Sequence, residues 1–235
     1  MQKAKNIVII SPFFFPEPIS TGKFNTDVAL KLQEEGHQVT VLCSHPFYPD
    51  WKTRYSSEKL EGITIIRGGN KIKYPNKISL RRIVLEIWYA LFILKNIKKH
   101  QNKIDVIIPV FPPSLAFYTA SFFIKKEIKK IGIIHDLQII YSSQKKGLFN
   151  KLITFFIKRV EKSCFKTCDT LIFLSEEMKN AALDIYKISK IKCQVQFPFT
   201  TIKEKSLSNN LKDILPDKQF NIVYSGALGE KQNPK

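Results

Sequence analysis

The stretch ISPFFFPEPISTGKFN, residues 10–25, joins the first strand pattern of this chain to its first helix pattern. Residues 6–10 before it are apolar and rich in β-branched side chains, which predicts a buried strand. Residues 24–35 after it have the spacing of a helix. Strand, loop and helix in this order begin an α/β fold, whose ligands bind beyond the carboxyl ends of the strands. We therefore expect this loop to border a binding site.

The same alternation continues along the chain, and several strands are apolar on both faces, as in a parallel sheet covered by helices on both sides. The predicted fold class is therefore α/β, with a Rossmann-like, doubly wound parallel sheet. Strands are predicted at residues 7–10, 38–43, 63–67, 105–110, 131–135 and 170–174, and helices at residues 24–35, 80–99, 114–126, 149–166 and 176–186.

The composition of the sequence changes near residue 200. Residues 1–200 are predicted to form the first domain, and the polar residues 201–218 a linker. Residues 219–235 start a second α/β domain, with a strand pattern followed by the glycine loop SGALG. No helix pattern follows that loop, so we expect this second domain to be incomplete.

Basic residues exceed acidic ones by 38 to 20 in the 235 residues, a formal net charge of +18. This favours anionic partners such as nucleic acid, phosphorylated metabolites or an acidic membrane surface, although compositional bias of the source genome explains it equally well. No helix-turn-helix, zinc-finger or aromatic RNA-binding motif is found, so nucleic acid is not an expected partner.

The predicted helix at 149–166 has one apolar face and one basic face. Lys151, Lys158 and Lys162 lie on the basic face, and Phe155 lies among them. Such a helix is typical of an interfacial membrane contact, because each Lys or Arg near anionic lipid contributes roughly 1 kcal/mol to the binding free energy. An ordinary amphipathic helix in a Lys-rich protein is the alternative.

The amino terminus has no signal-peptide pattern, because Lys3 and Lys5 lead directly into a strand. The four cysteines form no C-x-x-C pair, and no histidines have the spacing of a zinc site. We therefore expect a cytoplasmic protein without a bound metal.

The first loop has no G-x-G-x-x-G motif, and its prolines lack N–H donors, so an NAD enzyme is not expected. Thr21, Gly22 and Lys23 instead come at the expected start of the helix. A helix start with a glycine and a lysine is a candidate anion site. The alternative is that Gly22 only makes a turn.

Two further groups follow predicted strands. His135 and Asp136 come at the end of the fifth strand, where a histidine can serve as a base or as a hydrogen-bond partner; a structural cap is the alternative. His45, Tyr48 and Trp51 belong to the aromatic stretch HPFYPDW, which either stacks on a sugar ring or covers the sheet edge.

Taken together, these segments resemble the bacterial family-4 glycosyltransferases of the GT-B fold, in particular those that assemble colanic acid and O-antigen units. The resemblance implies that a nucleotide-diphosphate sugar lies between two Rossmann-like domains, and that the sugar is transferred with retained configuration, without an essential metal or cofactor. The resembling segments are ISPFFFPEPISTGKFN (10–25), EEGHQVTVLCSHPFYPDW (34–51), HDLQ (135–138), RVEKSCFKTCDTLIFLSEEM (159–178) and YSGALGEKQNP (224–234).

Site residues follow from the resemblance where this chain matches the family. It implies that His135 and Asp136 are catalytic. It implies donor or phosphate contacts at Thr21, Gly22, Lys23, Gly226, Gly229 and Lys231, and acceptor-side contacts at Phe14, His45, Tyr48 and Trp51.

The chain also departs from the family pattern. One glycine, Gly22, stands where the family has a pair, and the acidic motif that grips the donor sugar is missing. We therefore expect the N-terminal half of a transferase that is inactive alone. Its expected partners are a UDP- or GDP-linked sugar, a polyprenyl-linked acceptor, an anionic membrane surface at the inner face of the cytoplasmic membrane, and a second chain that supplies the donor domain. The alternative is a non-catalytic protein that binds membrane or precursor.

Overall fold

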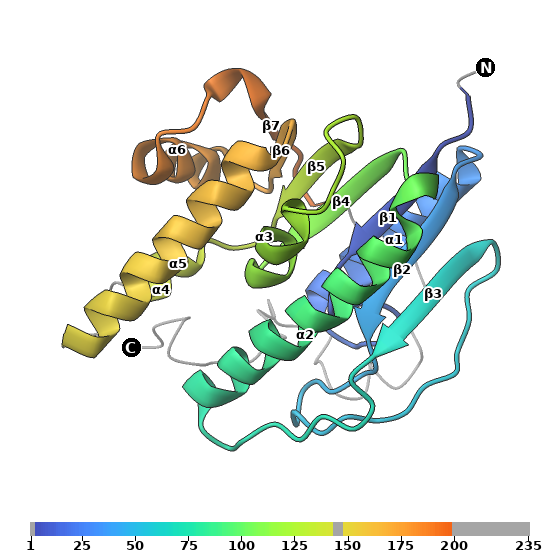
Figure 1. Cartoon of the computed structure of the whole chain (residues 1–235), viewed down its shortest axis with the longest axis horizontal. Coiled ribbons are helices and arrows are strands. Elements are labelled where there is room, and N and C mark those ends of the chain that lie inside the picture. The colour runs from blue at the N-terminus through green and yellow to red at the C-terminus, as the bar shows by residue number, and fades with distance from the viewer. Residues whose placement is uncertain (1–2, 143–147, 199–235) are drawn as a thin grey trace, which may run out of the picture. The chain divides into compact units, whose positions relative to one another are not determined.

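The described strands form one seven-stranded sheet (Figure 1), in a computed structural model that describes residues 3–142 and 148–198. Every pair of neighbouring strands is parallel, and their order is β3-β2-β1-β4-β5-β6-β7. This confirms the predicted Rossmann-like α/β fold. The strands are β1 (Asn6–Ile10), β2 (Gln38–Ser44), β3 (Ile63–Gly68), β4 (Val106–Phe111), β5 (Lys129–Ile134), β6 (Thr170–Phe173) and β7 (Cys193–Val195).

Helices cover the sheet on two faces, and each face has its own core. On one face, Ala29 of α1 packs with Ile9 and Val41 of the strands. On the other, Tyr89, Phe165 and Tyr186 come from three different helices. The helices are α1 (Ser20–Glu34), α2 (Ile78–His100), α3 (Leu115–Ser121), α4 (Gln138–Ser142), α5 (Leu148–Thr167) and α6 (Glu176–Tyr186).

Four elements differ from the predictions, and one of them is α1, which begins at Ser20 and not at residue 24. The strand β7 was not predicted, because its three residues are too few to show a period; pairing with β6 defines it. The short helix α4 was not predicted either. The helix α3 ends at Ser121, although it was predicted to continue to residue 126. The apolar residues Ile124 and Ile128 are buried, but they lie beyond the end of the helix.

The order of the strands reverses between β1 and β4, which pair from Ile7↔Val106 to Ile10↔Pro109. Ligands of open α/β sheets bind outside the carboxyl ends of the strands at such a switch point. The loops that follow β1, β2, β4 and β5 all begin at this edge. The predicted linker at 201–218 and the second domain at 219–235 lie outside the described residues, so these boundaries stay predictions.

Candidate functional site

The proline-rich loop after β1 is folded back onto α1 by polar contacts. Asn25 of α1 donates from Nδ2 to Oγ of Ser11 at 2.9 Å and to the carbonyl oxygen of Phe13 at 3.2 Å. The backbone nitrogen of Phe15 donates to Oγ1 of Thr26 at 3.1 Å. The first half of the loop is therefore held by the helix that it precedes.

Gly22 lies buried in the first turn of α1. A Cβ atom at this position would lie 3.0 Å from the carbonyl oxygen of Glu17, so a larger residue requires the loop to shift by a few tenths of an ångström. The N-cap residue, Ile19, offers no side-chain acceptor, and the first turn holds no acid. The helix therefore starts without an internal anion, which suits the predicted phosphate contact of Thr21, Gly22 and Lys23.

Glu17 joins the loop after β1 to the loop after β2. Its side chain is 3% exposed and accepts hydrogen bonds from the backbone nitrogens of Phe47, at 3.1 and 3.2 Å, and Tyr48. Burial raises the pKa of Glu17, and the two hydrogen bonds oppose that rise. Glu17 was not predicted as a site residue, since no local pattern marks a carboxylate whose partners lie about thirty residues away.

The aromatic residues after β2 mainly complete the core at the sheet edge. Phe47 is fully buried, with ring centroids 5.1 Å from Trp51 and 5.0 Å from Tyr74. The guanidinium of Arg81 lies 4.8 Å from the Trp51 ring. These contacts are those expected of a residue that covers the sheet edge, and the predicted acceptor contact of Trp51 stays a prediction.

The other predicted acceptor-side residues differ in exposure. His45 is 7% exposed, its Nδ1 accepts from the backbone nitrogen of Ser56 at 3.2 Å, and burial followed by the charge of Arg67 lowers its pKa. Tyr48 is half-buried. Phe14 is 1% exposed and belongs to the core beneath α1, and its predicted acceptor contact stays a prediction.

His135 follows β5 and lies beside the start of α1. Its backbone nitrogen donates to the carbonyl oxygen of Phe111 at 2.9 Å. Its ring meets the Phe24 ring edge-on, with centroids 5.1 Å apart. Burial lowers the pKa of His135 to about 4, and its buried Nε2 has no protein partner among the described residues. A neutral imidazole with a spare nitrogen can bind a ligand hydroxyl.

Asp136 accepts a 3.0 Å hydrogen bond at Oδ1 from the backbone nitrogen of Leu137. This bond is local, between the carboxylate and the backbone of the next residue. The contact between Phe24 and His135 places the first part of α1 beside the predicted catalytic pair. Gly226, Gly229 and Lys231 lie outside the described residues.

Two carboxylates from the helices α2 and α5 bind the segments that follow β4 and β5. Glu86 of α2 accepts from the backbone nitrogen of Leu115 at 2.9 Å and from Nε2 of Gln138 at 3.0 Å. Glu161 of α5 accepts from the backbone nitrogen of Gln138 at 3.0 Å and from the Tyr186 hydroxyl. Burial raises the pKa of Glu161 to about 7. Neither acid was predicted as a site residue, because a single acidic residue within a helix pattern is not a signal for a site.

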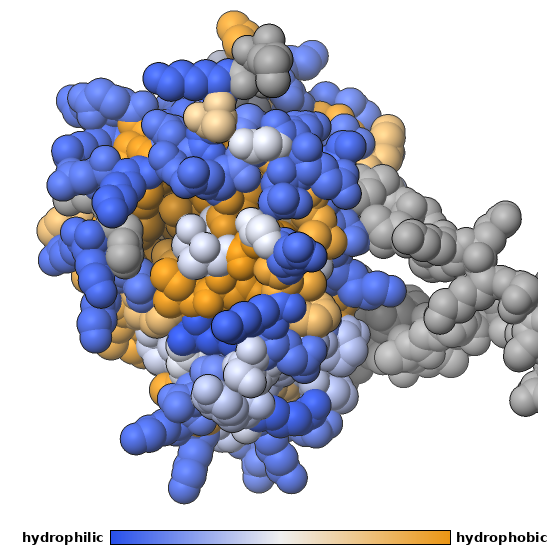
Figure 2. Space-filling view, turned by 90° about the vertical axis from the view of Figure 1, so that its right-hand side faces the viewer, coloured by the Kyte–Doolittle hydropathy of each residue, from blue (hydrophilic) through white to orange (hydrophobic). Residues whose placement is uncertain are grey.

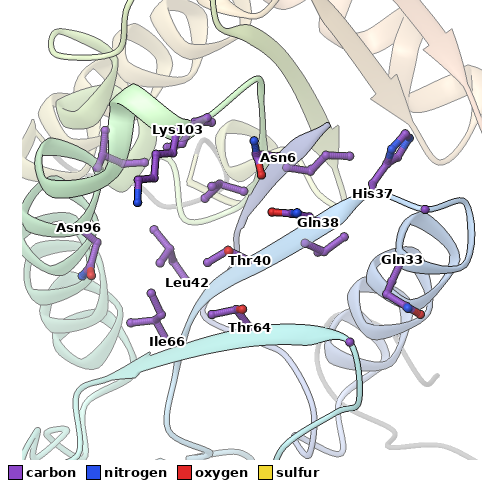
Figure 3. Close-up of a pocket in the computed structure, with 17 residues that line it drawn as sticks. Asn6, Gln33, His37, Gln38, Thr40, Leu42, Thr64, Ile66, Asn96 and Lys103 are labelled. Carbon is purple, nitrogen blue, oxygen red and sulfur yellow. The ribbon is translucent and has the colours of Figure 1, made fainter. Parts of the chain in front are cut away.

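A groove of about 510 Å³ lies at the opposite edge of the sheet. Seen from the side of β3, the molecule has an apolar hollow framed by polar side chains (Figure 2). The close-up shows Leu42 and Ile66 on the sheet facing Lys103 and Asn96 (Figure 3). Since it lies at the amino ends of the strands, this groove is separate from the site at His135.

Within residues 3–142 and 148–198, no group of three or more His, Cys, Asp or Glu side chains could hold a metal ion. No helix of these residues has the length and apolar character that a membrane crossing needs.

The sequence profile of Glycosyltransferase Family 4 matches residues 21–198. No curated protein sequence matches the chain.

Solved structures share the fold at low sequence identity. WaaG, "a glycosyltransferase involved in lipopolysaccharide biosynthesis", has a TM-score of 0.53 and 13% identity, over 80% of this chain and 44% of WaaG. Sucrose-phosphate synthase from Thermosynechococcus elongatus has a TM-score of 0.56 and 14% identity, over 81% of this chain and 47% of the synthase. The chain therefore spans less than half the length of either.

Proposed function

Because this chain belongs to glycosyltransferase family 4, we propose that it is the acceptor-side half of a retaining GT-B glycosyltransferase. The reaction would move a sugar from a nucleotide diphosphate to an acceptor hydroxyl. The observation that carries the proposal is the contact of Phe24 of α1 with His135 at the carboxyl edge of the sheet, one strand from the switch point. That is the edge at which ligands of such sheets bind.

The start of α1 is the proposed contact for the donor diphosphate. Its first turn points unpaired backbone N–H groups and the positive end of the helix dipole toward the edge. Gly22 lets the loop pack closely there, and the exposed Lys23 adds a cation. Together they stabilise charge on a leaving diphosphate, which is an electrostatic contribution to catalysis.

His135 is the proposed polar contact at the reacting centre. Its low pKa keeps the ring neutral at neutral pH, so its role is to hold a sugar or acceptor hydroxyl by a hydrogen bond and not to supply a positive charge. Asp136, turned toward its own helix start, would stabilise this segment and contribute negative charge near the acceptor.

The proposed acceptor is a polyprenyl-linked glycan of surface polysaccharide biosynthesis, at the inner face of the cytoplasmic membrane. The structural likeness to WaaG points toward lipopolysaccharide, and the basic helix α5 suits a protein that meets anionic lipid. His45, Tyr48 and Trp51 border the same edge and would form the acceptor side.

A second chain is proposed to supply the donor half, and Gly226, Gly229 and Lys231 are proposed to contact the donor. The matched part of the chain covers 44% of WaaG and 47% of the synthase. The competing function is a non-catalytic protein that binds precursor or membrane.

Calorimetric titration with UDP and GDP tests the proposal, with and without a lysate of the source cells. We expect no binding by the chain alone, and binding once a co-purifying donor half is present. Substituting Lys23→Ala should weaken that binding, whereas Lys52→Ala, an exposed lysine after β2, should not. Failure to bind under both conditions would favour the non-catalytic alternative. Tight binding by the chain alone would contradict the proposed division into halves.

A further inference from the structure

The segment between β2 and β3 carries one large aromatic side chain that remains in solvent. Tyr55 is 75% exposed, whereas Phe47 in the same segment is fully buried. Trp51 lies between them in the chain and packs against Phe47 and Tyr74. Tyr55 is therefore the aromatic residue of this segment that lies outside the core, and its ring is accessible to a ligand.

The ring of Tyr55 packs against the imidazole of His45. The two ring centroids lie 5.0 Å apart, and the ring planes meet at 30°. His45 is 7% exposed and directly follows Ser44, the last residue of β2. One face of the Tyr55 ring thus contacts a buried side chain at the carboxyl edge of the sheet, and the other face is open to solvent.

The imidazole that supports Tyr55 is fixed in orientation and in charge. Its Nδ1 accepts a hydrogen bond from the backbone nitrogen of Ser56 at 3.2 Å, so the proton of the neutral ring lies on Nε2. The backbone nitrogen of His45 donates to the carbonyl oxygen of Gly68 at 2.9 Å. Burial and then the charge of Arg67 lower the pKa of His45, so the ring under Tyr55 stays neutral at neutral pH.

Hydrogen bonds also hold the chain on both sides of Tyr55. Oγ1 of Thr53 donates to the carbonyl oxygen of Ile72 at 3.0 Å. The backbone nitrogen of Arg54 donates to the carbonyl oxygen of Pro46 at 2.8 Å, and the residue after Tyr55 is held by the bond to the imidazole. An exposed ring on a backbone held in this way is already placed for a ligand, which reduces the entropy cost of binding.

We propose that Tyr55 is the ring on which a sugar of the acceptor glycan stacks. One face of a sugar ring presents C–H groups, and the negative face of an aromatic ring attracts them. The open face of Tyr55 offers such a surface, and the neutral imidazole behind it adds no charge. That the sugar belongs to an acceptor rests on the proposed function, whereas the stacking surface itself rests on the geometry.

The position of Tyr55 along the sheet edge bears on the length of the acceptor. His45, which supports Tyr55, follows β2, and His135 follows β5, so the two histidines lie on opposite sides of the switch point. The carboxyl ends of β2 and β5 are three strand spacings apart, about 14 Å. This span is longer than one sugar ring. We therefore expect an acceptor of two or more sugars, in which the sugar on Tyr55 is not the one that reacts beside His135.

Saturation-transfer NMR tests the stacking, with the methyl glycosides of glucose, galactose, mannose and N-acetylglucosamine and the disaccharides lactose and cellobiose as probes. Saturation should pass from the protein to the C–H protons of at least one probe. Tyr55→Ser should raise the Kd of that probe about tenfold, since the ring is lost. Tyr55→Phe keeps the ring and should bind like the original chain.

The matched control is Phe122→Ser. Phe122 is a second exposed aromatic residue, 70% exposed, whose ring contacts that of Tyr118 with centroids 5.2 Å apart. It lies just after α3 and before β5, away from the carboxyl ends of the strands. This variant should bind every probe as the original chain does.

No transfer to any probe, or equal effects of Tyr55→Ser and Phe122→Ser, would overturn the proposal. Binding of uridine or guanosine in place of the sugars, lost in Tyr55→Ser, would show that the ring stacks on a nucleobase, which would also overturn it. Equal Kd values for the disaccharides and the methyl glycosides would contradict the expected acceptor length.

The UDP and GDP titration described above separates this proposal from the proposed function. Sugar binding that depends on Tyr55, without nucleotide binding under either condition, supports the stacking and favours the non-catalytic, precursor-binding alternative. Nucleotide binding without sugar binding contradicts the stacking alone.

Discussion

Gln138 donates a 3.0 Å hydrogen bond from its backbone nitrogen to Oε1 of Glu161, which joins the start of α4 to α5. Its side chain reaches Glu86 of α2 at the same distance. Gln138 thus lies between two buried carboxylates, two residues after Asp136. The segment after β5, which contains His135 and Asp136, is therefore positioned by hydrogen bonds to the helices α2 and α5.

Glu161→Gln should change how stability depends on pH. Burial raises the pKa of Glu161 from 4.5 to about 7 in the folded protein, so the folded state binds more protons than the unfolded state between these values. By linkage, the original chain loses stability relative to the variant as pH rises from 4.5 to about 7. Urea unfolding across this range measures the difference.

The control for that experiment is Glu127→Gln, because Glu127 is exposed. The difference between this control and the original chain should stay flat with pH. Other buried charges contribute equally to the stability of both proteins, so their contributions cancel in the difference. A difference between the Glu161→Gln variant and the original chain that is equally flat would show that Glu161 ionises as it does in water.

His135 should remain neutral until the pH approaches 4, because burial lowers its pKa to about that value. NMR of the imidazole ring should show no titration around 6.5, its ordinary value. The unfolded chain takes up the proton first as pH falls, so this residue makes the fold less stable toward acid. A ring that titrates near its ordinary value would contradict both the burial and the proposed neutral contact.

Gly22→Ala should destabilise the domain by about 1–3 kcal/mol, the usual cost of overpacking. The added Cβ meets the backbone oxygen of Glu17 at 3.0 Å, and a backbone atom cannot turn away as a side chain can. Helix propensity acts in the opposite direction, by about 1 kcal/mol. Urea unfolding of this variant and of Ser20→Ala, an exposed neighbour, provides the comparison. Stability equal to or above the original chain would mean that the loop moves aside.

Glu17→Gln should loosen the contact between the first two loops. One of the two side-chain oxygens becomes an amide donor that faces the backbone nitrogens of Phe47 and Tyr48. A buried donor without an acceptor costs about 1–3 kcal/mol. Hydrogen exchange at these two amides should speed up, whereas Glu58→Gln, in an exposed position, should leave it unchanged. Unchanged exchange in Glu17→Gln would contradict the assigned contact.

Local patterns predicted most of the fold because they depend on neighbouring residues alone. The β-branched runs in β1, β2 and β4 are buried strands, and the helix predicted at residues 176–186 has the observed bounds of α6, with Ser175 accepting from the backbone nitrogen of Met178 as its cap. The elements missed, α4 and β7, are shorter than the periods on which such a prediction rests.

The sequence by itself therefore determined the α/β class, the order of the long elements and the excess of positive charge, since composition and periodicity are properties of the chain. Only the tertiary structure decided which similar residues are buried and which are exposed. Phe14 lies in the core while Phe155 lies on the surface, and Glu17, Glu86 and Glu161 accept backbone hydrogen bonds from distant segments. Burial and long-range hydrogen bonds depend on what the fold brings together, and no local pattern records that.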